Sequence, residues 1–113
     1  MNKDIKITWA ERLRNETQCT GNLRKGGSFC AIGVLCLLHS ESTGNQWIRD
    51  LNLLQATHSY LGNVASLPNE VRDWAGLTGI EKLSYRTQTM KLTEFNDIGL
   101  PFNKLAELIE SQL

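Results

Sequence analysis

The longest uninterrupted apolar run of the chain covers residues 29–38 and reads Phe-Cys-Ala-Ile-Gly-Val-Leu-Cys-Leu-Leu. A run of this length is too short to cross a bilayer, which takes about 20 residues, and it has no polar face to turn toward water. Ser28 can cap a helix that begins at Phe29, and His39 suits the last turn of that helix. The pattern therefore predicts a central buried helix over about 29–40.

Gly33 lies in the middle of this apolar run. Glycine costs a helix interior about 1 kcal/mol relative to alanine. A reason to keep it there is the close approach of another backbone. We therefore expect Gly33 to contact a second element of the fold, so that a larger side chain at this position would overpack the core.

Apolar residues at the start of the chain recur with helical spacing. Ile5, Trp9 and Leu13 are four residues apart, and Asp4 can serve as an N-cap. This spacing predicts a helix over roughly 4–15. The alternation of apolar and polar side chains from Ile5 to Trp9 leaves a strand open as the alternative.

The end of the chain carries the strongest helical pattern. Pro101 can occupy a first helical turn, and the apolar positions that follow fall at i, i+3, i+4 and i+7. These positions are Phe102, Leu105, Ala106 and Ile109. A preceding helix from about 87 to 96 is suggested by Leu92 and Phe95, with a turn at 96–99 between the two helices. The sequence thus predicts a C-terminal helical hairpin.

The middle of the chain mixes turn signals with short apolar segments. The glycine-containing segment 15–28 predicts a loop or a short hairpin, and residues 55–61 have strand composition followed by a turn at Gly62-Asn63. The mixed helical spacings over 45–54 suggest a short helix, and 78–89 fits neither pattern cleanly.

Pro68 and Gly76 bracket a short segment that contains Val71 and Trp74. Proline in the first turn and glycine just past the end are the residues that helices prefer at those places. This predicts a helix over 68–75 with Val71 and Trp74 packed inward. Together these elements predict one α+β domain over residues 1–113, mostly helical, with one or two short β-hairpins.

Composition narrows the classes of function. Twelve basic residues balance twelve acidic ones, which argues against a general nucleic-acid binder but not against a local basic patch. Residues 1–20 lack the apolar core of a secretory signal, so we expect a cytoplasmic protein without a membrane segment. Three cysteines, two of them within the apolar run, suit reduced and buried thiols.

A candidate ligand site precedes the apolar run. The segment Arg24-Lys25-Gly26-Gly27-Ser28 combines two cations, flexible backbone amides and a predicted helix N-terminus, which are the ingredients of an anion or phosphate site. A solvated turn is the alternative. The aromatic residues available to stack on a ligand or a partner are Trp47, Tyr60 and Tyr85.

Cysteine chemistry offers two further interpretations. Cys30 in a first helical turn could act as the nucleophile of a small hydrolase with His39 or His58 as its base, although apolar neighbours favour a buried structural thiol. Cys19, Cys30, Cys36 and His39 could bind zinc, but their spacing lacks the paired short knuckles of structural zinc sites. We therefore predict no metal, cofactor or catalytic residue.

The segment 92–106 superficially resembles the entry to a helix-turn-helix, in which a glycine turn leads into a short amphipathic helix. Exposed acidic residues at Glu107 and Glu110 would repel phosphate. A helical hairpin that closes the core is the favoured interpretation, and a DNA-binding regulator is kept as an alternative.

Three blocks of sequence stand in a distinctive order. They are Ser28-Phe29-Cys30-Ala31-Ile32-Gly33-Val34-Leu35-Cys36, then Leu67-Pro68 through Val71 and Trp74 to Gly76-Leu77, then Phe95-Asn96-Asp97 with Gly99, Phe102, Ala106 and Ile109-Glu110. Over about residues 9–110 this order and spacing resembles a family of small, mostly uncharacterised proteins carried by tailed bacteriophages and prophages. Typical members often have adjacent cysteines where this chain has Phe29-Cys30. The resemblance implies a phage setting and supplies no catalytic residues.

These observations predict a non-enzymatic phage accessory protein that acts by binding in the host cytoplasm. Its expected partner is a host protein that it inhibits, or a small anionic nucleotide signal that it sequesters, in either case as a candidate countermeasure to host defence. A cysteine hydrolase using Cys30 and a DNA-binding regulator are the alternatives. The sequence specifies no oligomeric state.

Overall fold

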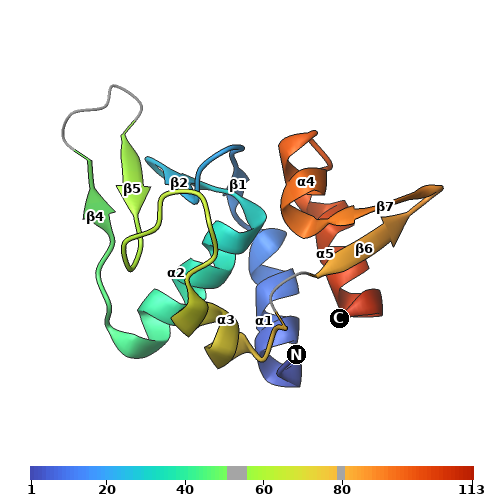
Figure 1. Ribbon diagram of the computed structural model, residues 1–113, viewed down its shortest axis with the longest axis horizontal. Helices are drawn as coiled ribbons and strands as arrows, with labels where there is room; N and C mark the ends of the chain where they lie inside the picture. Colours follow the sequence, from blue (N-terminus) through green and yellow to red (C-terminus); the bar gives the residue numbers. More distant parts are fainter. Residues whose placement is uncertain (51–55, 79–80) are drawn as a thin grey trace.

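The computed structural model describes residues 1–50, 56–78 and 81–113, and it confirms an α+β fold (Figure 1). The helices in these ranges are α1 (Lys3–Leu13), α2 (Ala31–Thr43), α3 (Asn69–Ala75), α4 (Leu92–Asp97) and α5 (Phe102–Gln112). The strands are β1 (Thr17–Gln18), β2 (Arg24–Lys25), β3 (Ser28–Phe29), β4 (Ile48–Arg49), β5 (Thr57–Ser59), β6 (Lys82–Tyr85) and β7 (Gln88–Lys91). No helix in the described part of the chain is long and apolar enough to span a membrane.

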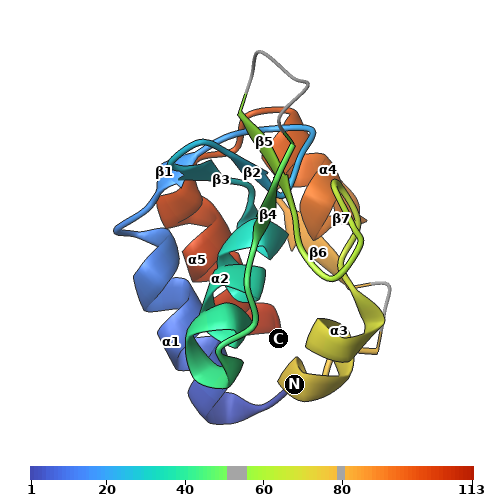
Figure 2. The same cartoon turned by 90° about the vertical axis from the view of Figure 1, so that its left-hand side faces the viewer.

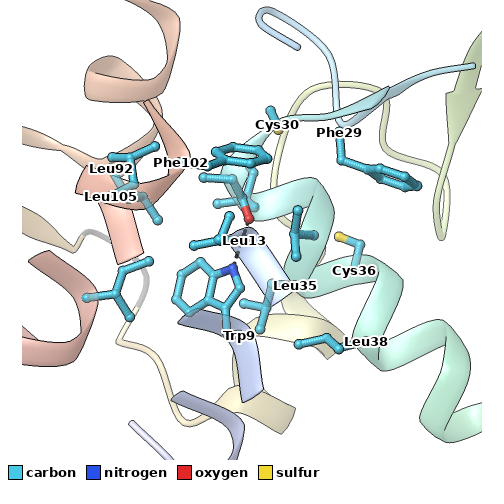
Figure 3. Packing of buried hydrophobic residues seen from close by; sticks show 14 of the residues in the cluster. Trp9, Leu13, Phe29, Cys30, Leu35, Cys36, Leu38, Leu92, Phe102 and Leu105 are labelled. Carbon is cyan, nitrogen blue, oxygen red and sulfur yellow. Dashed lines mark hydrogen bonds between the residues drawn. The ribbon is translucent and has the colours of Figure 1, made fainter. Parts of the chain in front are cut away.

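The predicted central helix is confirmed as α2, which is buried over most of its first two turns. Its helical neighbours include α1, α3 and α4, and α1 also packs along α5 (Figures 1 and 2). Figure 3 shows Trp9 of α1 inside the resulting core, where its indole nitrogen donates a hydrogen bond of 2.9 Å to the carbonyl oxygen of Ala31. The apolar run thus forms the centre of the core because it offers no face to water.

The boundaries of α2 differ from the sequence prediction. The helix begins at Ala31 with Cys30 in the N-cap position, whereas Ser28 and Phe29 form strand β3. The prediction of Ser28 as the cap is wrong because Phe29 is held in the sheet, where its carbonyl oxygen accepts a hydrogen bond from the Cys19 amide at 2.8 Å. At the other end the helix continues to Thr43 and stops at Gly44, whose φ of 80° favours glycine.

Gly33 makes the close backbone contact that its place in the helix predicts. A Cβ atom built on Gly33 would overlap the carbonyl oxygen of Leu23 and would lie 2.8 Å from the carbonyl carbon. The Leu23 backbone is itself fixed, since its amide donates to Val64 and its carbonyl accepts from Cys30, at 2.7 and 3.1 Å. The segment before β2 therefore crosses directly over α2 at this glycine.

The first sheet has the strand order β1-β3-β2-β5-β4. β1 and β3 run parallel, while the other neighbouring pairs are antiparallel. The segment 15–28 was predicted to form a loop or a short hairpin. It contains most of the hairpin formed by β2 and β3. The strand composition at 55–61 is confirmed by β5, and the turn follows one residue earlier than predicted, with Tyr60 bridging Asn63.

Two helical predictions are wrong. Residues 48–49 of the predicted helix over 45–54 form the edge strand β4, and its residues 51–54 lie outside the described residues. The predicted helix from about 87 begins at Leu92 instead, because Gln88–Lys91 pairs with Lys82–Tyr85 as the second sheet. Short segments of this kind take the structure of their pairing partner, which overrides their own helical spacing.

The remaining helices follow their sequence patterns closely. α3 lies between Pro68 and a left-handed Gly76, and α5 buries all four residues that its spacing placed inward. α1 extends over Lys3–Leu13, but its N-cap is Asn2, whose side chain accepts from the Ile5 amide at 2.9 Å, and not Asp4. The helices α4 and α5 form the predicted C-terminal helical hairpin around Gly99.

Candidate functional site

Basic side chains line one face of the first sheet. Arg24 on β2 pairs with His58 on β5, and His58 pairs with Arg49 on β4. Directly paired residues on neighbouring strands share a face, and neighbouring strands are about 4.8 Å apart. Three basic residues therefore form a row about 10 Å long, which we call the basic row.

Aromatic rings hold Arg24 in this row. Its guanidinium carbon lies 5.1 Å from the centre of the Phe29 ring and 5.4 Å from that of Trp47, and its Nε donates to the Gly26 carbonyl at 2.7 Å. Burial lowers the pKa of Arg24 from 12.5, yet an arginine stays charged at neutral pH. Neither Arg24 nor Arg49 forms an ion pair with a carboxylate in the described ranges.

Trp47 and Tyr60 pack beside the basic row, with their ring centres 4.9 Å apart. The Trp47 indole nitrogen is buried and has no hydrogen-bond partner among the described residues. Tyr60 is fully buried, and its hydroxyl lies 2.6 Å from His39 Nδ1. Tyr60 therefore supports the surface from below, and Trp47 is the aromatic residue that borders it.

The other predicted ligand residues are placed differently. Lys25 and Ser28 lie in the sheet on the face opposite the basic row, and the Gly26 amide is used by the Ala56 carbonyl at 2.9 Å. Gly27 completes the hairpin turn. Tyr85 belongs to the second sheet, where it packs edge-on against Phe95 at 6.3 Å. At the N-terminus of α2, the Asn96 side chain already accepts a hydrogen bond from Ala31, the first amide of that helix.

The sequence did not indicate Arg49 as a site residue, and it indicated His58 only as a possible base for Cys30. Each is an isolated basic residue without a motif, and only the register of β2, β5 and β4 aligns them with Arg24. The pKa of His58 is lowered by burial first, then by the positive charge of Arg24. His58 is therefore neutral at pH 7, and an anion bound beside it would raise its pKa.

Cys30 is buried in the N-cap position of α2. Burial raises the pKa of its thiol to about 12, against a smaller opposing effect of the Gly33 and Ile32 amides. The thiol is therefore protonated at neutral pH, and the protonated form is not nucleophilic. The two histidines bond elsewhere, His39 to Tyr60 and His58 Nδ1 to the Ala56 carbonyl at 2.8 Å.

No group of three or more His, Cys, Asp or Glu side chains in the described part of the chain is arranged to hold a metal ion. Cys19, Cys30 and Cys36 are free thiols. In the C-terminal hairpin, Glu110 pairs with Arg14 at 2.6 Å and Glu107 with Lys104 at 3.4 Å. The outer face of α5 therefore carries alternating charges and no basic stripe.

His39 forms a second polar cluster at the far end of α2. It is almost fully buried, contacts the Tyr60 hydroxyl through Nδ1, lies 3.5 Å from a Glu70 oxygen through Nε2, and packs edge-on against Trp74 at 5.1 Å between ring centres. Burial lowers the pKa of His39, and Glu70 opposes this effect only in part. The folded protein thus keeps a neutral histidine in contact with two other elements.

Stability is expected to fall as the pH drops below 6.5. In that range the unfolded chain, with ordinary histidines of pKa 6.5, binds protons more readily than the folded state does, so acid favours unfolding. The fall continues until the pH passes the lowered pKa of His39. Urea unfolding between pH 7.5 and 5.5 measures this fall in the free energy of unfolding. The His39→Gln variant should show a smaller dependence of that free energy on pH. The same slope in this variant and in the parent would assign the effect to other groups, of which His58 is the first to replace in turn.

A family model described as "Domain of unknown function (DUF8296)" matches residues 1–113 of the chain. No curated protein and no solved structure matches the chain.

Proposed function

The chain belongs to this family, DUF8296, and we propose that it acts by binding a small anionic ligand at the basic row, without performing a reaction on it. The observation that carries this proposal is the alignment of Arg24, His58 and Arg49 on three neighbouring strands. Two guanidinium groups on either side of a histidine, without carboxylate partners in the described ranges, attract an anion with more than one negative charge, and such an anion would favour the charged form of His58.

The aromatic residues suit a ligand that carries its charge on phosphate. Arg24 is held in place by its contacts with Phe29 and Trp47, so that little side-chain entropy is lost when it donates to an oxygen. The buried Trp47 indole N–H lacks an acceptor among the described residues, which costs about 1 to 3 kcal/mol, and a ligand oxygen that reached it would recover part of that cost.

The proposed ligand is a small nucleotide signal. The resemblance to phage and prophage proteins supports a setting in the host cytoplasm. There such a protein would bind the signal, lower its free concentration and so oppose host defence. The balanced net charge and the shortness of the basic row favour a small molecule over duplex DNA, whose binding draws on many phosphate contacts.

Mass spectrometry of nucleotides that co-purify with the protein from cells tests this proposal. We expect a nucleotide with the parent chain and a loss of at least about tenfold with Arg49→Gln, because Arg49 is exposed and forms no ion pair with a described residue, so that the substitution removes mainly a ligand contact. Arg86→Gln is the matched control. Arg86 also lies over an aromatic ring, Tyr85 at 5.3 Å, but in the second sheet.

Three outcomes are informative. A nucleotide that is lost with Arg49→Gln and retained with Arg86→Gln supports the proposal. Absence of any nucleotide from the parent, or equal recovery from both variants, contradicts it. Parallel capture from host lysate shows whether a host protein with an acidic surface is the partner instead, in which case the same Arg49→Gln variant should release it.

A further inference from the structure

A cavity of about 470 Å³ lies at the N-terminal end of α2. Its walls come from the start of α2, the segment 65–67, α3 and the beginning of α4, and Figure 2 shows α3 and α4 on the same side of α2. None of Arg24, His58 and Arg49 lines it. The volume is within the range of about 300 to 1,000 Å³ that is usual for small-molecule sites.

Much of the lining of this cavity is apolar. Among these residues are Ile32, Leu67, Leu77 and Leu92, together with Trp9 from α1. The Trp9 ring is fully buried behind these residues and is fixed by the hydrogen bond from its nitrogen to the Ala31 carbonyl. The cavity therefore offers a fixed apolar surface to the body of a ligand.

The acidic and basic side chains of the lining differ in how far they are already bound by other groups of the protein. Asp97 accepts a hydrogen bond from the Gly21 amide at 3.1 Å, and Glu81 accepts from both the amide and the hydroxyl of Thr78 at 2.6 Å. Lys91, in contrast, forms no ion pair with a described residue, and the ion pair of Arg72 within the described ranges is with its chain neighbour Asp73, at 3.2 Å. The carboxylates are thus already engaged by donors, whereas Lys91 has no ion-pair partner among the described residues and Arg72 is paired with one exposed carboxylate, which a ligand anion can replace.

Uncharged polar groups complete the rim. The side chains of Ser66, Asn69 and Thr93 line the cavity and make no hydrogen bond to another described residue. They come from three separate segments around the opening. Each can donate to or accept from a ligand at little cost, because none has to leave another partner.

From this arrangement we propose that the cavity is a second binding site, separate from the basic row, for a small organic anion with an apolar body. The apolar body lies against Leu67, Leu77 and Leu92. Its carboxylate or phosphate group bonds to Arg72 or Lys91. A ligand that carries both parts binds more tightly than one that carries either alone, because a bare phosphate gains nothing from the apolar lining and a neutral ring gains little from the two cations.

Nitrogen–proton NMR of the tryptophan indoles tests this proposal with the intact chain. Trp9 lines the cavity, Trp47 borders the basic row, and Trp74 packs on His39, so one spectrum reports each site separately. With phenyl phosphate as the probe, we expect a saturable shift of the Trp9 signal at millimolar concentrations. Inorganic phosphate and benzyl alcohol, which each lack one part of the proposed ligand, should leave that signal in place.

Arg72→Gln should weaken the binding of phenyl phosphate at Trp9 about tenfold or more, since it removes a charge-assisted bond. Arg49→Gln, at the basic row, should not change it. A Trp9 signal that phenyl phosphate leaves unmoved, or that moves equally with inorganic phosphate, overturns the cavity proposal. Movement of Trp47 alone also overturns it but leaves the proposed function at the basic row intact.

Discussion

Replacing Gly33 with alanine is expected to lower the free energy of unfolding by about 3 kcal/mol or more, which would reduce Tm by about 10 °C or more. The added Cβ would overlap the Leu23 carbonyl oxygen, an atom of the backbone and not the end of a flexible side chain. Leu23 cannot retreat freely, because its amide and its carbonyl bond to Val64 and Cys30. Helix propensity alone predicts the opposite result, a gain of about 1 kcal/mol.

Gly27→Ala is the matched control for this prediction. A Cβ at Gly27 would meet no atom of the described structure within 4 Å, and the residue has no positive φ. We expect its stability to stay within about 0.5 kcal/mol of the parent, as is usual for a surface substitution. Urea unfolding of both variants makes the comparison. A Gly33→Ala variant as stable as the parent would mean that the two backbones do not touch at this point.

The sequence predicts an element well when local residues determine its structure, and poorly when pairing with another segment determines it. The 3.6-residue spacing of α5 and the proline and glycine around α3 are local signals, and both helices formed as predicted. Strands β4 and β7 were missed because their structure comes from pairing with β5 and β6. Gly33 is an intermediate case, since its cost to a helix was visible but its partner Leu23 was not.

The same distinction applies to the candidate site. Arg24 and Trp47 were identifiable by residue type, and the fold brings them together. Arg49 and His58 join them only through strand register, which a single sequence does not display. Tyr85 fits the aromatic pattern equally well and lies in the other sheet. Residue type thus indicates candidate ligand contacts, while the pairing of strands determines which of these residues share a surface.

Asn96 shows how a single polar side chain can join segments far apart in the sequence. It is almost fully buried, and its Oδ1 accepts from the Ala31 amide and from Gln18 Nε2, both at 3.1 Å. Its Nδ2 donates to the Cys19 carbonyl at 3.0 Å. One residue of α4 therefore caps α2 and forms hydrogen bonds with β1 and the residue that follows it. The sequence suggested only a turn here, because nothing local to Asn96 indicates its three partners.

Asn96→Leu is expected to destabilise the fold by about 3 kcal/mol. Leucine is similar in size, so the loss comes from the buried Ala31 amide and the part-buried Cys19 carbonyl that are left without partners, at up to about 1 to 3 kcal/mol each. Asn103→Leu, at an exposed position on α5, is the control and should cost less than about 0.5 kcal/mol. Urea unfolding measures both.

A double-mutant cycle with Gln18→Met separates the network from simple loss of burial. Gln18 bonds both to Asn96 and to the Leu100 carbonyl, the latter at 2.9 Å, so the two substitutions remove a shared hydrogen bond. If the network acts as a unit, the double variant should lose at least about 0.5 kcal/mol less than the sum of the single losses. Strict additivity would mean that Asn96 stabilises the fold only through Ala31 and Cys19, and that its hydrogen bond with Gln18 contributes nothing to the stability.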